Sequence, residues 1–136
     1  MKIKSTISYP INEPTINGNI YNKEALYDAF QNKAFVEMNE SKEIPVHYMS
    51  GTYQSEPIGF ATAKLLDNGK VEVEAQIFDK VLSESLSTYD GLKDVGIILA
   101  GKCSKTYKGI LSNIKYREAL LTLHPAMHCS MEIIEQ

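Results

Sequence analysis

The chain has 136 residues, of which 43% are hydrophobic and 23% are charged, a composition typical of a folded domain and unlike that of a disordered chain. Its formal net charge of −3 gives no support to nucleic-acid binding, because binding of phosphates depends on clustered Lys and Arg. From the chain length we expect one domain, residues 1–136. No stretch has the apolar length of a signal peptide or a membrane span, so we expect a protein made in a cytoplasm and not bound to a membrane.

Residues 1–31 predict a strand, a loop and a helix. Residues 2–9 alternate apolar and polar side chains with the two-residue period of a strand, and Pro10 ends the alternation. Residues 11–22 have the Asn, Pro and Gly content of a loop, with Asn17-Gly18 as a turn. Asn22 can cap a short amphipathic helix over residues 23–31.

Residues 32–57 predict less regular structure. Residues 32–43 are mostly polar, and we expect an irregular segment there. Residues 44–49 predict a short strand. Because Pro45 has no N–H group, this strand should lie at a sheet edge or have Pro45 among its first residues. Residues 50–57 are expected to form a loop.

The clearest prediction is a hairpin over residues 58–78. Residues 71–77 alternate apolar and polar side chains, and residues 58–66 form a second strand-like run. Asp67-Asn68-Gly69 between them supplies the positive-φ residues of a tight turn. An isolated hairpin is marginal in water, so other elements must cover its apolar face.

The C-terminal part predicts a helix over residues 80–87 and a series of strands. Residues 95–103 are apolar and rich in β-branched side chains, which is typical of a central strand. Three more strands are expected over residues 110–116, 118–123 and 130–134. Together these elements predict an α+β domain in which the strands form a small antiparallel β-barrel, closed or partly open, with two short helices.

His47 is the first candidate for chemistry, although a single histidine in a strand more often bonds a carbonyl than acts as a base. A nucleophile would have to be a Ser or Cys that the fold brings close to it. The candidates are Cys103, Ser104, Cys129 and Ser130, and none has a recognisable nucleophile motif such as GxSxG.

His124, His128 and Cys129 are close enough in sequence to suggest a metal site, but ordinary loop packing is the favoured interpretation. Pro125 argues against a helix that would align the two histidines, and no fourth ligand is evident nearby. We therefore expect no metal and no cofactor. The two cysteines, Cys103 and Cys129, are expected to be free, mostly buried thiols.

The order of several short motifs resembles that of the prohead (capsid maturation) proteases of tailed phages, which are relatives in fold of the herpesvirus assemblins. Asn17-Gly18-Asn19-Ile20-Tyr21 before a helix looks like the family's entry motif, and Ile44-Pro45-Val46-His47 looks like the strand with its catalytic histidine. Pro57-Ile58-Gly59-Phe60-Ala61 through Val71-Glu72-Val73-Glu74-Ala75 is similar to a hairpin of the family. The run Glu118-Ala119-Leu120-Leu121-Thr122-Leu123-His124-Pro125-Ala126 looks like the family's closing strand. The resemblance spans residues 17–126.

The resemblance implies a serine protease that acts on capsid and scaffold proteins, with His47 as the base and Glu118 as the supporting acid. The stretch Val95-Gly96-Ile97-Ile98-Leu99 stands where the family has its nucleophilic serine, and Gly96 occupies the serine position. A histidine with no hydroxyl or thiol to deprotonate cannot catalyse acyl transfer. We therefore expect His47 and Glu118 to be vestigial.

The expected function is that of a non-catalytic virion protein, a capsid decoration or cement subunit in a multimeric assembly with the major capsid protein or other virion proteins. The alternatives are an active prohead protease with another nucleophile, or a neck or tail component. Partner contacts are expected on the first strand, the 11–22 loop and the last strand, with these candidate side chains: Ile3, Ile7, Tyr9, Ile11, Ile16, Tyr21, Met131 and Ile133.

Overall fold

The computed structural model describes residues 1–31, 43–88 and 91–136. Residues 32–42 of the predicted irregular segment lie outside the described residues. In these ranges the chain forms seven strands and two helices. In chain order they are β1 (Lys2–Ser8), α1 (Lys23–Gln31), β2 (Ile44–Ser50), β3 (Tyr53–Leu65), β4 (Val71–Ile77), α3 (Lys80–Leu86), β5 (Gly96–Lys105), β6 (Leu111–Thr122) and β7 (His128–Glu135). The α+β class is confirmed.

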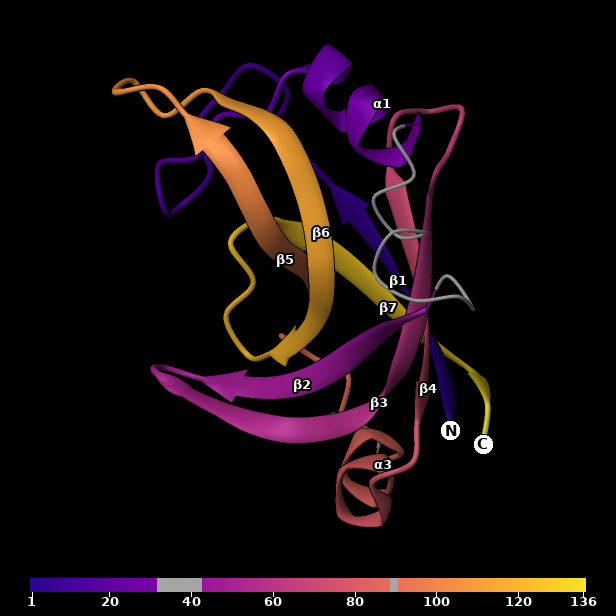
Figure 1. The fold of residues 1–136 in the computed structure, drawn as a ribbon. Coiled ribbons are helices and arrows are strands. Elements are labelled where there is room, and N and C mark those ends of the chain that lie inside the picture. The colour runs from indigo at the N-terminus through magenta and orange to yellow at the C-terminus, as the bar shows by residue number, and fades with distance from the viewer. Residues whose placement is uncertain (32–42, 89–90) are drawn as a thin grey trace.

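All seven strands belong to one sheet, in the order β5-β6-β2-β3-β4-β1-β7. Neighbouring strands are antiparallel except β2 and β6, which run parallel with Val46 opposite Ala119. The sheet is therefore mixed, and the prediction of a purely antiparallel one is wrong. The parallel pair arises because the chain forms the whole β2-β3-β4 meander and then crosses over before it returns as β5 and β6 beside β2 (Figure 1).

The sheet is strongly curved but not closed, so the predicted barrel is also wrong. Its two end strands, β5 and β7, come near each other without pairing. At this seam the Ser5 hydroxyl of β1 donates to the Ile97 carbonyl at 3.0 Å and accepts the Ile97 N–H at 3.4 Å. The hydroxyl of Ser5, rather than the main chain of β7, thus bonds the N–H and carbonyl of Ile97 at the edge of β5. Because β5 and β7 do not pair, the sheet stays open.

The hairpin is confirmed: β3 and β4 pair from Gly59–Ile77 to Leu65–Val71, and Gly69 has the positive φ that the turn requires. The predicted loop over residues 50–57 is wrong, since β3 already begins at Tyr53 and pairs with β2. The prediction that β5 is a central strand is wrong as well. β5 lies at the end of the sheet. Its first half is nevertheless buried by the curvature of the sheet, and this burial explains its apolar side chains.

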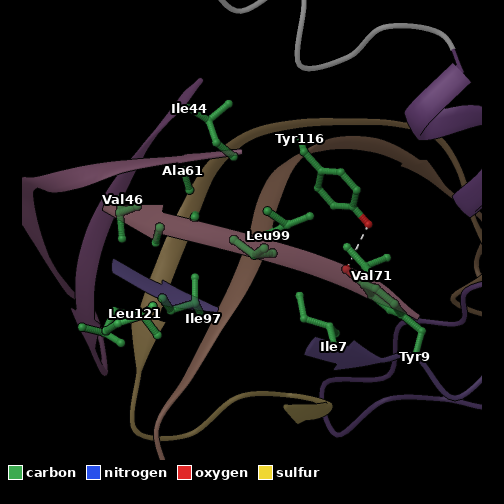
Figure 2. Packing of buried hydrophobic residues seen from close by; sticks show 14 of the residues in the cluster. Ile7, Tyr9, Ile44, Val46, Ala61, Val71, Ile97, Leu99, Tyr116 and Leu121 are labelled. Carbon is green, nitrogen blue, oxygen red and sulfur yellow. Dashed lines mark hydrogen bonds between the residues drawn. The ribbon is translucent and has the colours of Figure 1, made fainter. Parts of the chain in front are cut away.

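The concave face of the sheet encloses the core. Alternate residues of β1 and β4 are fully buried there, and they meet residues of β5 and β6 from across the sheet (Figure 2). The fully buried large side chains include Ile3, Ile7, Val71, Val73, Ile77, Ile97 and Leu121. The hydroxyls of Tyr9 and Tyr116 lie 3.2 Å apart at one end of this core, so each buried hydroxyl has a partner.

Both helices begin at side-chain caps and lie outside the sheet. The carboxamide of Asn22 accepts the Ala25 N–H at 2.7 Å, which confirms the predicted cap of α1. The carboxylate of Asp79 accepts the Leu82 N–H at 2.9 Å and caps α3. α1 packs against β6, and its buried residues are Ala25, Leu26 and Ala29, while α3 lies beyond the other ends of the strands (Figure 1).

Candidate functional site

Three strands bring His47 and Glu118 together with two residues that the sequence did not single out. His47 is on β2 and Glu118 is on β6. Gln54 and Ser55 are the second and third residues of β3. The parallel pairing places His47 beside Leu120, two residues from Glu118. The sequence predicts a loop over residues 50–57, so Gln54 and Ser55 were missed as neighbours of the imidazole.

The imidazole of His47 has a partner at each nitrogen. Its Nδ1 lies 2.8 Å from the Ser55 carbonyl oxygen, and its Nε2 lies 3.6 Å from Oε2 of Glu118. The carboxamide of Gln54 donates to the same carboxylate oxygen at 3.0 Å. The His47 and Glu118 side chains are 15% and 29% exposed, so solvent reaches both.

This arrangement fixes which nitrogen of His47 could act as a base. A carbonyl oxygen can only accept a hydrogen bond, so Nδ1 must carry a proton, and the exchangeable proton position is Nε2. In a Ser-His-Asp triad the carboxylate holds one ring nitrogen and the nucleophile meets the other. Here a carbonyl holds Nδ1 and the carboxylate of Glu118 faces Nε2, so the position that a nucleophile needs is occupied by an acid.

Gly96 lies on β5, two strands away from β2. It is opposite Thr122, which is opposite Met49, so Gly96 is roughly 10 Å to the side of Met49 at the usual strand spacing. Position 96 is buried, and a Cβ built there would come within 3.0 Å of the Cβ and Sγ of Cys129 and of the Cγ of Pro125. The position expected for the nucleophile thus has no side chain, and a new one would fit only if Cys129 and Pro125 moved by a few tenths of an ångström.

The candidate nucleophiles on β5 are far from the imidazole. Ile98 is the β5 residue level with Leu120 and His47, and Cys103 and Ser104 lie five and six residues farther along the strand, roughly 17–20 Å away at the usual rise. Both are exposed, and Ser104 is paired with Ser112 in the hairpin. The structure does not bring either of them to His47.

The candidates on β7, Cys129 and Ser130, are on the far end strand of the sheet. The thiol of Cys129 turns toward Gly96 and donates a weak hydrogen bond to the Met127 carbonyl at 3.6 Å. Burial raises the pKa of Cys129 to about 11, so the thiol stays protonated near neutral pH. The exposed residue Ser130 lies opposite Thr6. Both cysteines are free thiols, but the expectation that they are mostly buried is wrong for Cys103, which is exposed.

The possible metal ligands do not gather. His124 and His128 are exposed on either side of the turn before β7, and Cys129 faces Gly96 instead. Among residues 1–31, 43–88 and 91–136, no group of three or more His, Cys, Asp or Glu side chains could hold a metal ion.

The expected partner-binding side chains separate into two groups. Ile3, Ile7, Tyr9 and Tyr21 are buried in the core, so the expectation that they contact a partner is wrong. β1 also pairs with a strand on each side and offers no free edge. These residues read as surface candidates because a strand's position in a sheet cannot be seen from its own sequence.

The remaining candidates lie at the surface or near it. Ile16 is 88% exposed and Ile11 is 38% exposed, and both belong to the loop between β1 and α1. Met131 and Ile133 are partly buried on β7, which is an end strand of the sheet.

A groove of about 680 Å³ lies between α1 and the β3–β4 turn, lined in part by Leu26, Phe30 and Leu65. Neither His47 nor Glu118 lines it. In the part of the chain that the structure describes, no helix is long and apolar enough to cross a membrane.

No protein-family model, no curated protein and no solved structure matches the chain.

Proposed function

We propose that the chain is a non-catalytic structural protein of a tailed-phage virion, a decoration or cement subunit of the capsid, built on a fold similar to that of the prohead proteases. Its partners are the major capsid protein or other virion proteins, and it acts in the virion as part of a multimeric assembly. The proposal combines the resemblance in motif order with the geometry around His47.

The observation that carries the proposal is the absence of a nucleophile at Gly96 together with the tight packing there. A serine at this position would meet Cys129 and Pro125. The Nε2 of His47 faces the side chain of Glu118 and not a hydroxyl or a thiol. Position 96 is packed as a structural position, in keeping with a subunit that binds rather than cuts.

Exposed apolar side chains provide the second support. Ile16 and Tyr107, which are 88% and 94% exposed, belong to two loops that the main chain ties together. The Ile20 N–H donates to the Gly109 carbonyl at 2.7 Å, and the Leu111 N–H donates to the Ile20 carbonyl at 2.9 Å. Strongly exposed apolar side chains on two loops that are joined by main-chain hydrogen bonds are typical of an interaction surface.

Co-sedimentation with phage heads tests the proposal. The purified protein is mixed with heads from a phage that lacks it, and the pellet is analysed. We expect saturable binding that is weakened about tenfold or more by Ile16→Asp combined with Tyr107→Asp, because buried apolar contacts carry most binding energy. Leu123→Asp with Phe78→Asp, at two exposed apolar positions elsewhere, is the matched control. Binding that never exceeds that of an unrelated protein would end the proposal.

An active prohead protease is the second candidate, and the placement of Glu118 beside His47 favours it. Gln54 holds the carboxylate in place, as a supporting residue would in a catalytic site. This candidate predicts that the protein cleaves its cognate capsid precursor and that His47→Ala abolishes the cleavage. Intact-mass analysis of the precursor after incubation distinguishes the two, since the structural proposal predicts no cleavage by either form.

A further inference from the structure

The hairpin of β5 and β6 concentrates positive charge on a chain that is acidic overall. Between Val95 and Arg117 the sequence has five basic residues and no acidic one, although the whole chain has 17 Asp and Glu against 14 Lys and Arg. The five are Lys102, Lys105, Lys108, Lys115 and Arg117. All five are exposed.

The placement of these charges costs stability, because Lys102 lies directly opposite Lys115 in the β5–β6 register. Like charges in directly opposed positions of a sheet are destabilising. Elsewhere the strand lysines have acidic neighbours: Lys4 pairs with Glu132, and Lys64 with Glu72. Among the described residues Lys102, Lys105 and Lys108 form no ion pair, so these three charges near the end of the hairpin have no acidic partner there.

The same hairpin has a free main-chain edge. β5 is the last strand of the sheet on its side, and in the described ranges it pairs only with β6. Ile97 directs its N–H and carbonyl to Ser5, away from β6. Because these groups alternate along a strand, those of Leu99, Gly101 and Cys103 point the same way. Beyond the Ser5 contact, residues 101–105 of this strand are exposed.

Gly101 keeps this part of the strand close to β6. A Cβ at position 101 would lie 1.9 Å from the Lys115 carbonyl oxygen, so only glycine fits. The register shifts between Ala100 and Gly101, where β6 gains one residue, Arg117. Such a bulge increases the local twist. Residues 101–105, beyond this bulge, are all exposed.

We propose that the outer edge of β5, Leu99 to Lys105, binds an extended acidic polypeptide segment as an added strand. Main-chain hydrogen bonds would supply affinity, and Lys102 and Lys105 would select carboxylates on the added strand. Lysines beside an open edge discourage pairing with most strands, and the same charges favour a strand with Glu or Asp. A nucleic acid would use the charges alone and leave the main-chain edge unpaired.

This inference deepens the proposed function, on which it rests for the origin of the segment: an acidic stretch of a virion protein. The binding test uses no particles. A protein that binds heads but not the peptide would contradict this inference alone, and one that binds the peptide but not heads would contradict the proposed function alone.

Fluorescence anisotropy with a labelled peptide of repeated Glu-Glu-Thr tests the inference. It is about ten residues long, enough to cover the edge from Leu99 to Lys105, and it has Glu on both faces because Lys102 and Lys105 lie on opposite faces of β5. We expect binding that is weakened about tenfold or more by Lys102→Gln combined with Lys105→Gln, and equally by replacing each Glu of the peptide with Gln. Lys70→Gln combined with Lys93→Gln removes the same charge at exposed positions elsewhere, and should change affinity by less than about twofold.

Two further variants test strand addition itself. Cys103→Pro removes a main-chain donor from the open edge, and proline is tolerated there because that N–H does not bond β6. Peptides N-methylated at alternate amides make the same test with the protein unchanged, so the result does not depend on folding of the proline variant. Both should reduce affinity about tenfold. The proposal is overturned if neither does, if an oligothymidylate of ten nucleotides binds as tightly as the peptide, or if the peptide does not bind.

Discussion

The thiol of Cys129 lies against the backbone of Gly96, so that a Cβ added at position 96 would come within 3.0 Å of the Cys129 Sγ. These two residues belong to β5 and β7, the two end strands of the sheet. Their contact packs the two ends together where no main-chain hydrogen bonds join them. The position at which the resemblance places the nucleophile of a protease is therefore part of the packing between the ends of the sheet.

Substitutions at Gly96 should reveal this packing. We expect Gly96→Ser to destabilise the protein by about 1–3 kcal/mol, because the new side chain overpacks the seam, and to give no proteolytic activity. In a Cys129→Ala background the added cost of Gly96→Ser should fall by at least about 0.5 kcal/mol, since the nearest sulfur is gone. Urea unfolding of the four proteins measures this. Additive costs would show that the two residues do not interact.

The Ser5 hydroxyl should contribute measurably to stability. Ser5→Ala leaves the N–H and carbonyl of Ile97 without their partner at a fully buried position, and we expect a loss of about 1–3 kcal/mol in the free energy of unfolding. Thr6→Ala, on the next residue of β1 but on its more exposed face, is the control and should cost less than about 0.5 kcal/mol. Equal effects of the two changes would show that the seam is not held by this hydroxyl.

Much of the local structure followed from sequence patterns, and the arrangement of strands did not. The alternation of residues 71–77 and the turn at Gly69 predicted the β3–β4 hairpin because both depend on neighbouring residues. The parallel pairing of β2 with β6 joins residues about 70 positions apart, and no local pattern specifies such a contact. The end position of β5 was missed because its apolar residues resemble those of a central strand. They are buried by the curvature of the sheet, although β5 pairs with only one neighbour among the described residues.

The candidate site was predicted only in part. His47 and Glu118 are near each other, as the resemblance implied, but Gln54 and Ser55 were hidden in a segment that reads as a loop. The turn that lets β3 begin at Tyr53 depends on Gly51, whose φ of +59° places it in the left-handed region. The glycine in Ser50-Gly51-Thr52 was the sequence signal that could have predicted a hairpin turn here, and with it a strand that contains Gln54 and Ser55.

Alkaline pH should destabilise the protein through its buried tyrosines. Burial raises the pKa of Tyr21 to about 12 and raises the pKa values of Tyr9 and Tyr116 further above their usual range. In the unfolded chain these groups lose their protons near pH 10, so above that pH the unfolded state binds fewer protons than the folded state and stability falls. The urea midpoint between about pH 8 and 11 measures the fall, which should be shallower for Tyr116→Phe. An unchanged midpoint over this range would contradict the burial of these hydroxyls.

The two thiols should differ strongly in reactivity. Cys103 is exposed, whereas burial raises the pKa of Cys129 to about 11, which leaves only about one thiolate in a thousand at pH 8. We expect a disulfide reagent such as Ellman's reagent to modify one thiol of the native protein rapidly and the second only on unfolding. Peptide mapping identifies the first as Cys103. Rapid reaction of Cys129 in the native state would mean that the seam beside Gly96 opens readily.

The number of copies in purified mature virions is the most direct test of a structural role. Quantitative mass spectrometry with isotope-labelled peptides of this chain and of the major capsid protein gives the ratio of the two. A decoration subunit repeats with the symmetry of the shell, so we predict hundreds of copies per particle, on the order of the capsid protein itself. Absence from the mature particle would contradict the account, and a dozen copies or fewer would assign the chain to the neck or tail instead.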